Sequence, residues 1–211
     1  MAELLTVMVI FGIISAVVAA VVGPILRAPG QEQLKVDTTQ AVAKTVYRIQ
    51  SDIRQTTASG VYYCTNSVPT TCSAPSAGAT PAPAQTLVLT SPRNGPKGPL
   101  VLSSAGAALQ QGYNVYWLQQ NPQHATETDL DFAFVPNPVG WQDTASYISL
   151  HIVDPAITAS ASAQIAATSV TAMNVGLNSS TNDVRFSLTA RSNAGQSTNE
   201  ATFVADTTFR N

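Results

Sequence analysis

The stretch of sequence that decides the fold is Leu4–Leu26, LLTVMVIFGIISAVVAAVVGPIL, which contains no charged residue and is followed by Arg27. As an α-helix with a rise of about 1.5 Å per residue, it would be about 35 Å long, enough to cross a bilayer core of about 30 Å. A secretory signal peptide would place basic residues before a shorter apolar run, whereas here an acid, Glu3, precedes a long one. The sequence therefore predicts a membrane-spanning helix.

The composition of the whole chain limits the functions that it can have. Its 211 residues are enough for one compact domain and an appendage. Only 10% of them are charged, and the net charge is −2, which argues against binding nucleic acid through bulk charge. The two histidines and two cysteines are scattered along the chain, so a metal site built only from them is not expected.

A second helical pattern follows the apolar run. Pro29–Gly30 is predicted to interrupt or kink the helix, which becomes amphipathic from Gln31 to about Thr57. Its apolar stripe, expected to pack on a sheet, has spacings of four, three and four: Val42, Val46, Ile49 and Ile53. Lys44, Arg48 and Asp52 lie on the polar side, where Arg48 can pair with Asp52 across one turn.

The remainder of the chain has the period of two that is typical of strands. Residues 73–84, SAPSAGATPAPA, are of low complexity and are expected to form an exposed loop without core-forming side chains. Strands are expected at 86–90, 100–103, 113–119, 130–135, 147–153, 164–176, 184–191 and 201–209, with a helical turn at 105–111. Because no helical crossovers separate the strands, the predicted fold class is α+β, a long N-terminal helix packed on an antiparallel sheet. Trp117 and Trp141 are expected to belong to the core.

The N-terminal residues resemble a known signal. Glu3-Leu4-Leu5, followed by an aliphatic run containing Gly12, resembles the class III signal of type IV pilins and pseudopilins. In that family a prepilin peptidase removes a basic leader, the new N-terminal residue is N-methylated, and the fifth mature residue is a glutamate. The resemblance implies that Glu3 is this glutamate, which pairs with the N-terminal amine of a neighbouring subunit during assembly, and that the leader and two mature residues would precede Met1. No processing site is visible in the sequence itself.

Two further segments narrow the resemblance. Tyr47–Gln55, YRIQSDIRQ, resembles the "RLQxDLRQ" segment of PilW-type and GspJ-type minor pilins, and the terminal Arg210–Asn211 resembles the end of the same group. The resemblance covers residues 1–57 and 200–211. It implies a pilin-like helix at 1–57, with a membrane or filament-core segment at 1–27 and an amphipathic half at 31–57. A β-rich head is expected at 58–211.

The resemblance implies a structural protein rather than an enzyme. A minor type IV pilin or pseudopilin primes or caps the assembly of a type IV pilus or of a type II secretion pseudopilus. Before assembly the subunit would lie in the bacterial inner membrane with its head in the periplasm, and afterwards in the filament at the cell surface. Two alternatives stay open: a filament-tip subunit that binds DNA or a surface, and a singly anchored periplasmic β-rich protein unrelated to filaments.

Cys64 and Cys72 are separated by seven residues. In a protein that displays its bulk outside the cytoplasm, two cysteines so close favour a structural disulfide. A redox pair would prefer two intervening residues, and a metal site lacks further ligands nearby. The sequence therefore predicts the pair Cys64–Cys72.

Few other residues are candidates for chemistry. His124 and His151 are isolated, with His151 expected to face solvent, and neither a serine-nucleophile motif nor a phosphate-binding glycine loop is present. No catalytic or cofactor-binding residue is predicted. Glu127, Asp129 and Asp131 could converge on Ca²⁺ if they lay on a loop, although a solvated strand edge is favoured. Arg93 and Lys97 could touch DNA phosphates, although an ordinary exposed loop is favoured.

Overall fold

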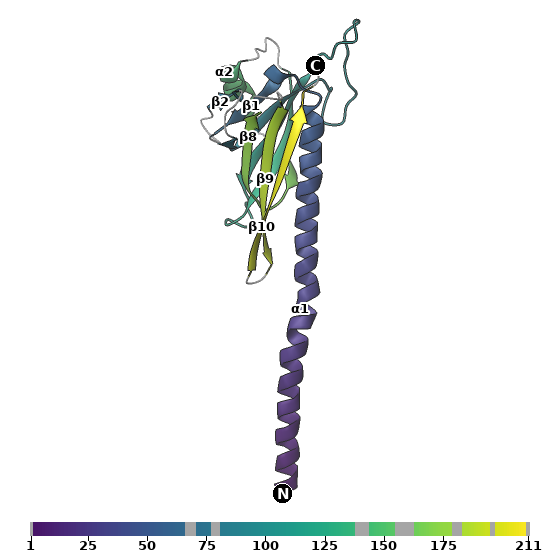
Figure 1. Ribbon diagram of the computed structural model, residues 1–211, viewed down its shortest axis with the longest axis vertical. Coiled ribbons are helices and arrows are strands. Elements are labelled where there is room, and N and C mark those ends of the chain that lie inside the picture. Colours follow the sequence, from purple (N-terminus) through teal and green to yellow (C-terminus); the bar gives the residue numbers. More distant parts are fainter. Residues whose placement is uncertain are drawn as a thin grey trace.

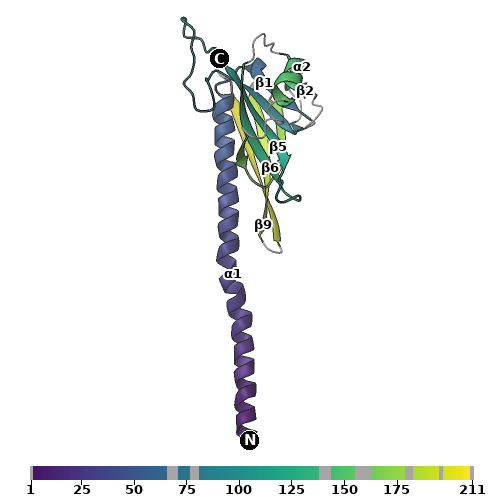
Figure 2. The ribbon, with the colours of Figure 1, turned by 180° about the vertical axis from the view of Figure 1, so that it is seen from behind.

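The computed structural model describes residues 2–65, 71–76, 81–137, 144–154, 163–178, 183–194 and 197–209. One long helix, α1 (Ala2–Ile53), lies against a β-rich head along its C-terminal part, and its N-terminal part projects away from the head (Figure 1). The view from behind shows the same arrangement (Figure 2). Trp141 and the terminal Arg210–Asn211 lie outside the described residues.

α1 continues through Pro29 and Gly30 without a break, so of the predicted interruption or kink the interruption is wrong, and the kink stays a prediction. A proline inside a helix removes one backbone donor, and the segments on both sides are strong helix formers that hold the helical geometry. Near its end α1 becomes the amphipathic element that its spacing predicts. Val42, Val46, Ile49 and Ile53 are all buried, whereas Lys44 is exposed.

The described part of the chain contains ten strands. They are β1 (Val61–Cys64), β2 (Cys72–Ser73), β3 (Ala82–Ala84), β4 (Thr86–Ser91), β5 (Gly112–Gln120), β6 (Thr128–Pro136), β7 (Gln164–Ala167), β8 (Val170–Leu177), β9 (Asp183–Ala194) and β10 (Ser197–Thr208). All their pairings are antiparallel, and they form two sheets, ordered β2-β1-β4-β5-β6-β7 and β10-β9-β8-β3. A 3₁₀ turn (Ala58–Gly60) precedes β1, and a short helix, α2 (Ala145–Ile148), continues as a π-helical turn at Ser149–Val153. The predicted α+β class with a helix packed on antiparallel strands is confirmed, with two sheets in place of one.

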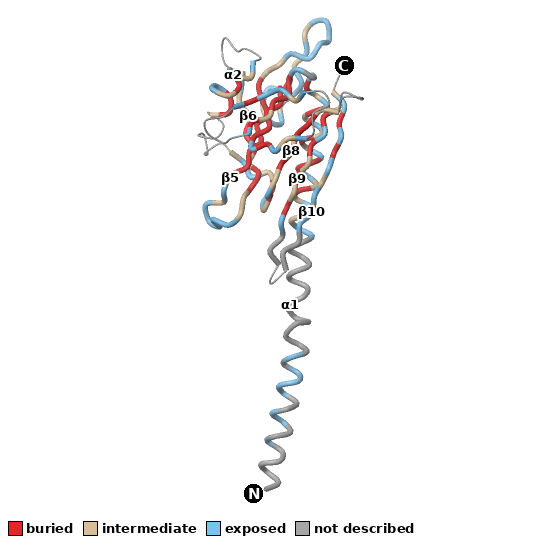
Figure 3. Tube along the Cα trace, turned by 60° about the vertical axis from the view of Figure 1, so that its left-hand side comes forward, coloured by how far each residue is buried: buried red, intermediate tan, exposed pale blue. Residues whose placement is uncertain are grey.

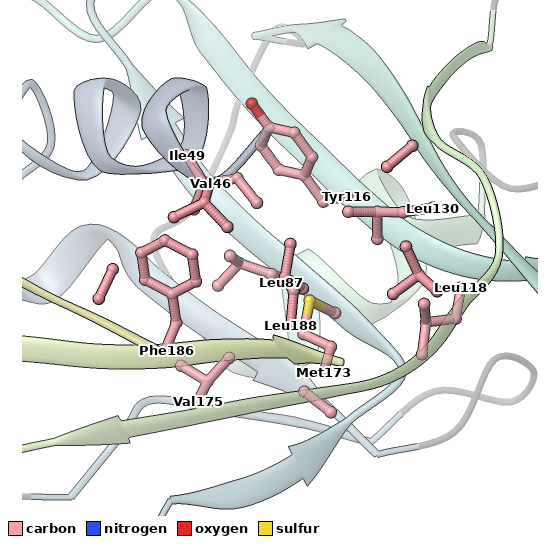
Figure 4. Close-up of a cluster of buried hydrophobic side chains, with 14 of the residues drawn as sticks. Val46, Ile49, Leu87, Tyr116, Leu118, Leu130, Met173, Val175, Phe186 and Leu188 are labelled. Atoms are coloured by element: carbon pink, nitrogen blue, oxygen red, sulfur yellow. The ribbon is translucent and has the colours of Figure 1, made fainter. Parts of the chain in front are cut away.

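Two clusters of buried side chains stabilise the head. The larger lies between α1 and the two sheets, and Figure 4 shows Val46 and Ile49 of α1 beside Tyr116 and Phe186. The smaller lies on the other face of the six-stranded sheet, where Trp117 and the Cys64–Cys72 pair pack with Ile148 and Ile152. Alternate residues of β4 and β5 therefore serve different clusters. Buried residues concentrate in the head, while the described residues of the projecting part of α1 are exposed (Figure 3).

The predicted strand at 147–153 is wrong, because these residues form α2 and its π-helical continuation. The Thr144 side chain accepts a hydrogen bond from the Tyr147 N–H at 3.3 Å, which is the usual way to begin a helix. Ile148 and Ile152, four residues apart, are both fully buried.

The predicted strand at 100–103 and helical turn at 105–111 are also wrong. Only isolated bridges occur there, Arg93 to Leu100 and Leu102 to Ala108, within the loop that joins β4 and β5. Gly106 has a positive φ of 79°, which closes a tight turn that an ordinary helical residue would not adopt.

The low-complexity segment contributes to the head more than predicted. Within residues 73–84, β3 pairs with β8, and Ala84 is buried. The absence of a side chain on Gly176 of β8 lets the chain just before β3 lie close to it, since a Cβ on Gly176 would lie 2.9 Å from the Cα of Pro81.

The predicted strand at 164–176 is two strands, β7 and β8, which belong to different sheets and are separated by Ser169 with a φ of 58°.

Candidate functional site

The projecting part of α1 carries apolar side chains that the head does not cover. Met8, Phe11, Val17 and Val18 are exposed, Phe11 by 72%. A row of uncovered apolar side chains normally marks a surface that meets lipid or another protein. This surface is therefore the first candidate for function.

In the part of the chain that the structure describes, no helical segment combines the length and apolar character that crossing a membrane requires. The predicted span, residues 4–26, includes many side chains outside the described part, and it stays a prediction. The side chain of Glu3 is also outside it, so the assigned assembly role stays a prediction.

A polar cluster fixes α1 against the six-stranded sheet. The Tyr116 hydroxyl donates to Oδ2 of Asp52 at 2.6 Å, and the Arg48 guanidinium lies 3.7 Å from the centre of the Phe132 ring. Burial raises the pKa of Asp52, and the Tyr116 hydrogen bond and the Arg48 charge oppose this rise. Arg48 thus reaches the sheet rather than simply forming the predicted one-turn pair with Asp52. These contacts place the YRIQSDIRQ segment at the junction of α1 with β5 and β6.

The chain passes from α1 to β1 through a close approach to β4. The Thr56 hydroxyl donates to the carbonyl oxygen of Thr90. A Cβ on Gly60 would lie only 2.0 Å from Oγ1 of Thr90, so this position has no room for a side chain. The end of α1 is therefore held in one position over the sheet.

The predicted disulfide is confirmed. Cys64 and Cys72 face each other across β1 and β2 and are joined, with both residues buried. The bond ties the short strand β2 to the sheet next to α2, which supports a structural role.

The predicted calcium residues do not form a ligand set. Asp129 is buried and accepts hydrogen bonds from Nδ2 of Asn121 at 2.8 Å and from the Ser169 N–H at 3.1 Å. Burial, followed by the charge of Asp129, raises the pKa of Asp131. Among the described residues, Glu127 included, no group of three His, Cys, Asp or Glu side chains could hold a metal ion.

The two predicted DNA contacts have different surroundings. Arg93 is engaged internally, since its Nε donates to Oε1 of Gln55 at 2.7 Å and its Nη1 to the Gly98 carbonyl at 2.9 Å. Lys97 is exposed and lines a groove with Lys44 and Arg48 of α1. Sequence analysis missed this grouping, because nothing in the spacing of the residues shows that the loop lies beside α1.

The two histidines lie on separate exposed turns. His124 is exposed in the turn between β5 and β6. His151 is exposed, as predicted, but on a helical turn, where its ring lies 4.5 Å from that of Tyr147.

Comparison of the chain with protein-family models, with curated proteins and with solved structures finds no match.

Proposed function

We propose that this protein is a non-enzymatic filament subunit, a minor pilin or pseudopilin that primes or caps the assembly of a type IV pilus or a type II secretion pseudopilus. One observation carries the proposal. α1 has 52 residues, and among its described side chains the buried ones lie from Val42 onward, whereas the described apolar side chains of its projecting part are exposed.

A projecting apolar helix needs an apolar environment. Before assembly the inner membrane would supply it, with the head in the periplasm, and afterwards the helices of other pilin or pseudopilin subunits would. Gly12, Ser15 and Ala16 lie along this part of α1, and small residues of this kind let helices approach closely.

Glu3 would provide the specific contact in such a bundle. A carboxylate in an apolar setting is costly unless an opposite charge satisfies it, and the N-terminal amine of a neighbouring subunit would do so. The packed junction of α1 with the head would keep the head at a fixed position along the helix. The proposal assigns no catalytic residue and no cofactor.

The experiment that tests the proposal is mass spectrometry of the N-terminal peptide from protein isolated from its own cells. The expected peptide begins two residues before Met1 with a methylated amine, which makes Glu3 the fifth residue after cleavage by a prepilin peptidase. An unprocessed Met1, or a cut beyond the apolar run, would reject the proposal.

A further inference from the structure

A groove with positively charged walls lies between α1, the loop that follows β4, and the edge strand β7. Its volume is about 560 Å³, and its cations are Lys44 and Arg48 of α1 and Lys97 of the loop. Its other lining residues are uncharged, and Asp52, which attracts Arg48, does not line it, so Lys44 and Lys97 have no acid within the groove, although the whole chain has a net charge of −2. Figures 1 and 2 show the loop that joins β4 and β5 beside the end of α1.

The two lysines of this groove are available to a ligand. Both are exposed, and neither forms an ion pair with a described residue. The ion pairs found among the described residues instead join β9 to β10, Arg185 with Asp206 and Arg191 with Glu200.

The groove is built on contacts that hold its walls in place. The Thr45 hydroxyl donates to the carbonyl oxygen of Ala166 at 2.6 Å, which ties α1 to the edge of β7. Arg93 bonds Gln55 and Gly98, which ties the loop to the end of α1. Because both walls are fixed, a ligand would not have to bear the entropic cost of ordering them.

The surroundings of the groove distinguish between classes of anion. Lys44 lies 18 residues beyond Leu26, or about 27 Å along the helix, so a bilayer around the apolar run would leave its headgroups out of reach. No aromatic side chain lines the groove, whereas single-stranded nucleic acids are usually held by stacking on aromatic rings. The carboxylates of an acidic polypeptide match the lysines, and its carbon chain matches the apolar side chains of Ile165 and Pro96 in the same groove.

We propose that this groove is a docking site for an acidic segment of a partner polypeptide, whose carboxylates pair with Lys44 and Lys97. The site does not depend on N-terminal processing or on filament assembly, so it can be tested separately from the proposed function.

The test measures binding of a fluorescein-labelled peptide of alternating Glu and Ala to the full chain in zwitterionic detergent micelles, by fluorescence anisotropy. The variants Lys97→Glu and Lys44→Glu are each expected to weaken binding about fivefold or more, because each reverses a charge in the site. The matched control is Arg54→Glu, since Arg54 is exposed in the turn directly after α1 but does not line the groove. This variant is expected to change the affinity by less than about twofold.

Three results would overturn the proposal. One is the absence of binding to the unmodified chain, or equal binding of a peptide in which Gln replaces every Glu. Another is an equal loss of affinity in the Arg54→Glu control, which would indicate unspecific charge attraction. The third is equally tight binding of a thymidine oligonucleotide, which would assign the groove to nucleic acid.

Discussion

Asp52 places a carboxylate between α1 and β5, where it contacts Tyr116, whose ring packs against that of Phe132. A charge in such surroundings loses hydration, and only specific partners compensate for the loss. The Tyr116 hydroxyl supplies one hydrogen bond, and the nearby charges of Arg48 and Arg93 supply further attraction. This hydrogen bond is therefore one of the contacts that fix the helix on the sheet.

Tyr116→Phe is expected to lower the free energy of unfolding by about 1.5–3 kcal/mol, because a hydrogen bond to a charged group is lost and the carboxylate stays buried. Chemical denaturation of the full chain in detergent, followed by the fluorescence of its two tryptophans, would measure the change. Tyr47→Phe is the matched control, since Tyr47 lies exposed on α1 and should lose almost nothing. Equal stability of the two variants would contradict the role of this hydrogen bond.

The raised pKa of Asp52 also has a defined consequence for stability. The folded chain keeps the proton of this carboxyl to a higher pH than the unfolded chain, whose reference pKa is 3.8. The free energy of unfolding therefore decreases as pH rises from 3.8 through the raised pKa. Asp52→Asn removes this dependence, so the stability of the unmodified chain relative to the variant should increase on acidification from neutral pH.

Parallel denaturation of the two proteins at neutral pH and close to pH 3.8 would measure this difference. Asp206 titrates in the opposite sense, because its hydrogen bond with Arg185 lowers its pKa. It is present in both proteins, however, and its contribution cancels in the comparison. A difference that does not change with pH would show that Asp52 has no raised pKa.

At the scale of elements, the stripe on α1 joins the helix to both sheets. Ile49→Ala is expected to cost about 2–5 kcal/mol of the free energy of unfolding of the head, because the residue is fully buried and its removal leaves a cavity. Val36→Ala on the same helix is the control, since Val36 is half exposed. Thermal unfolding of the full chain would compare them, and similar midpoints would show that the stripe does not stabilise the head.

The outcome for residues 147–153 shows why an alternating pattern can mislead. Ile148, Leu150 and Ile152 fit a strand with one apolar face, but Ile148 and Ile152 equally fit one side of a helix. Leu150 distinguishes the two interpretations. A strand would bury it with Ile148 and Ile152, but it is 66% exposed in the structure, as the helix requires. β4, β5 and β6 were predictable because β-branched or aromatic residues recur in each of them and favour a strand over a helix.

The positions of candidate site residues were less predictable than the elements. The disulfide followed from two cysteines close together in the chain, a local signal. Lys97 meets Lys44 only because the loop after β4 lies beside α1, a contact between distant parts of the sequence. Asp52 was assigned to the polar side of the helix from its spacing, and only its alignment with Tyr116 makes it part of the junction.

At the scale of the whole molecule, α1 joins two regions with different requirements. Its C-terminal part completes the core of the head, and its projecting part presents apolar residues outside the head (Figure 3). The two hydrophobic clusters involve α1 only from Val42 onward, and a disulfide adds to them, so changes near the start of α1 should leave the packing of the head intact. Mutations can therefore test the proposed assembly role separately from the folding of the head.

Glu3→Ala tests that separation on the proposed filament subunit. The variant is expected to remain in the membrane fraction, because the apolar run is unchanged, and to be depleted about tenfold or more from sheared filaments. The reason is that the amine of the neighbouring subunit would be left as an uncompensated charge in an apolar bundle. Immunoblots of the membrane and filament fractions would give the ratio, with Asp37→Ala as the control, since Asp37 is an exposed carboxylate on the same helix. Normal incorporation of the Glu3 variant, or equal depletion of both, would show that Glu3 does not make the assigned pairing.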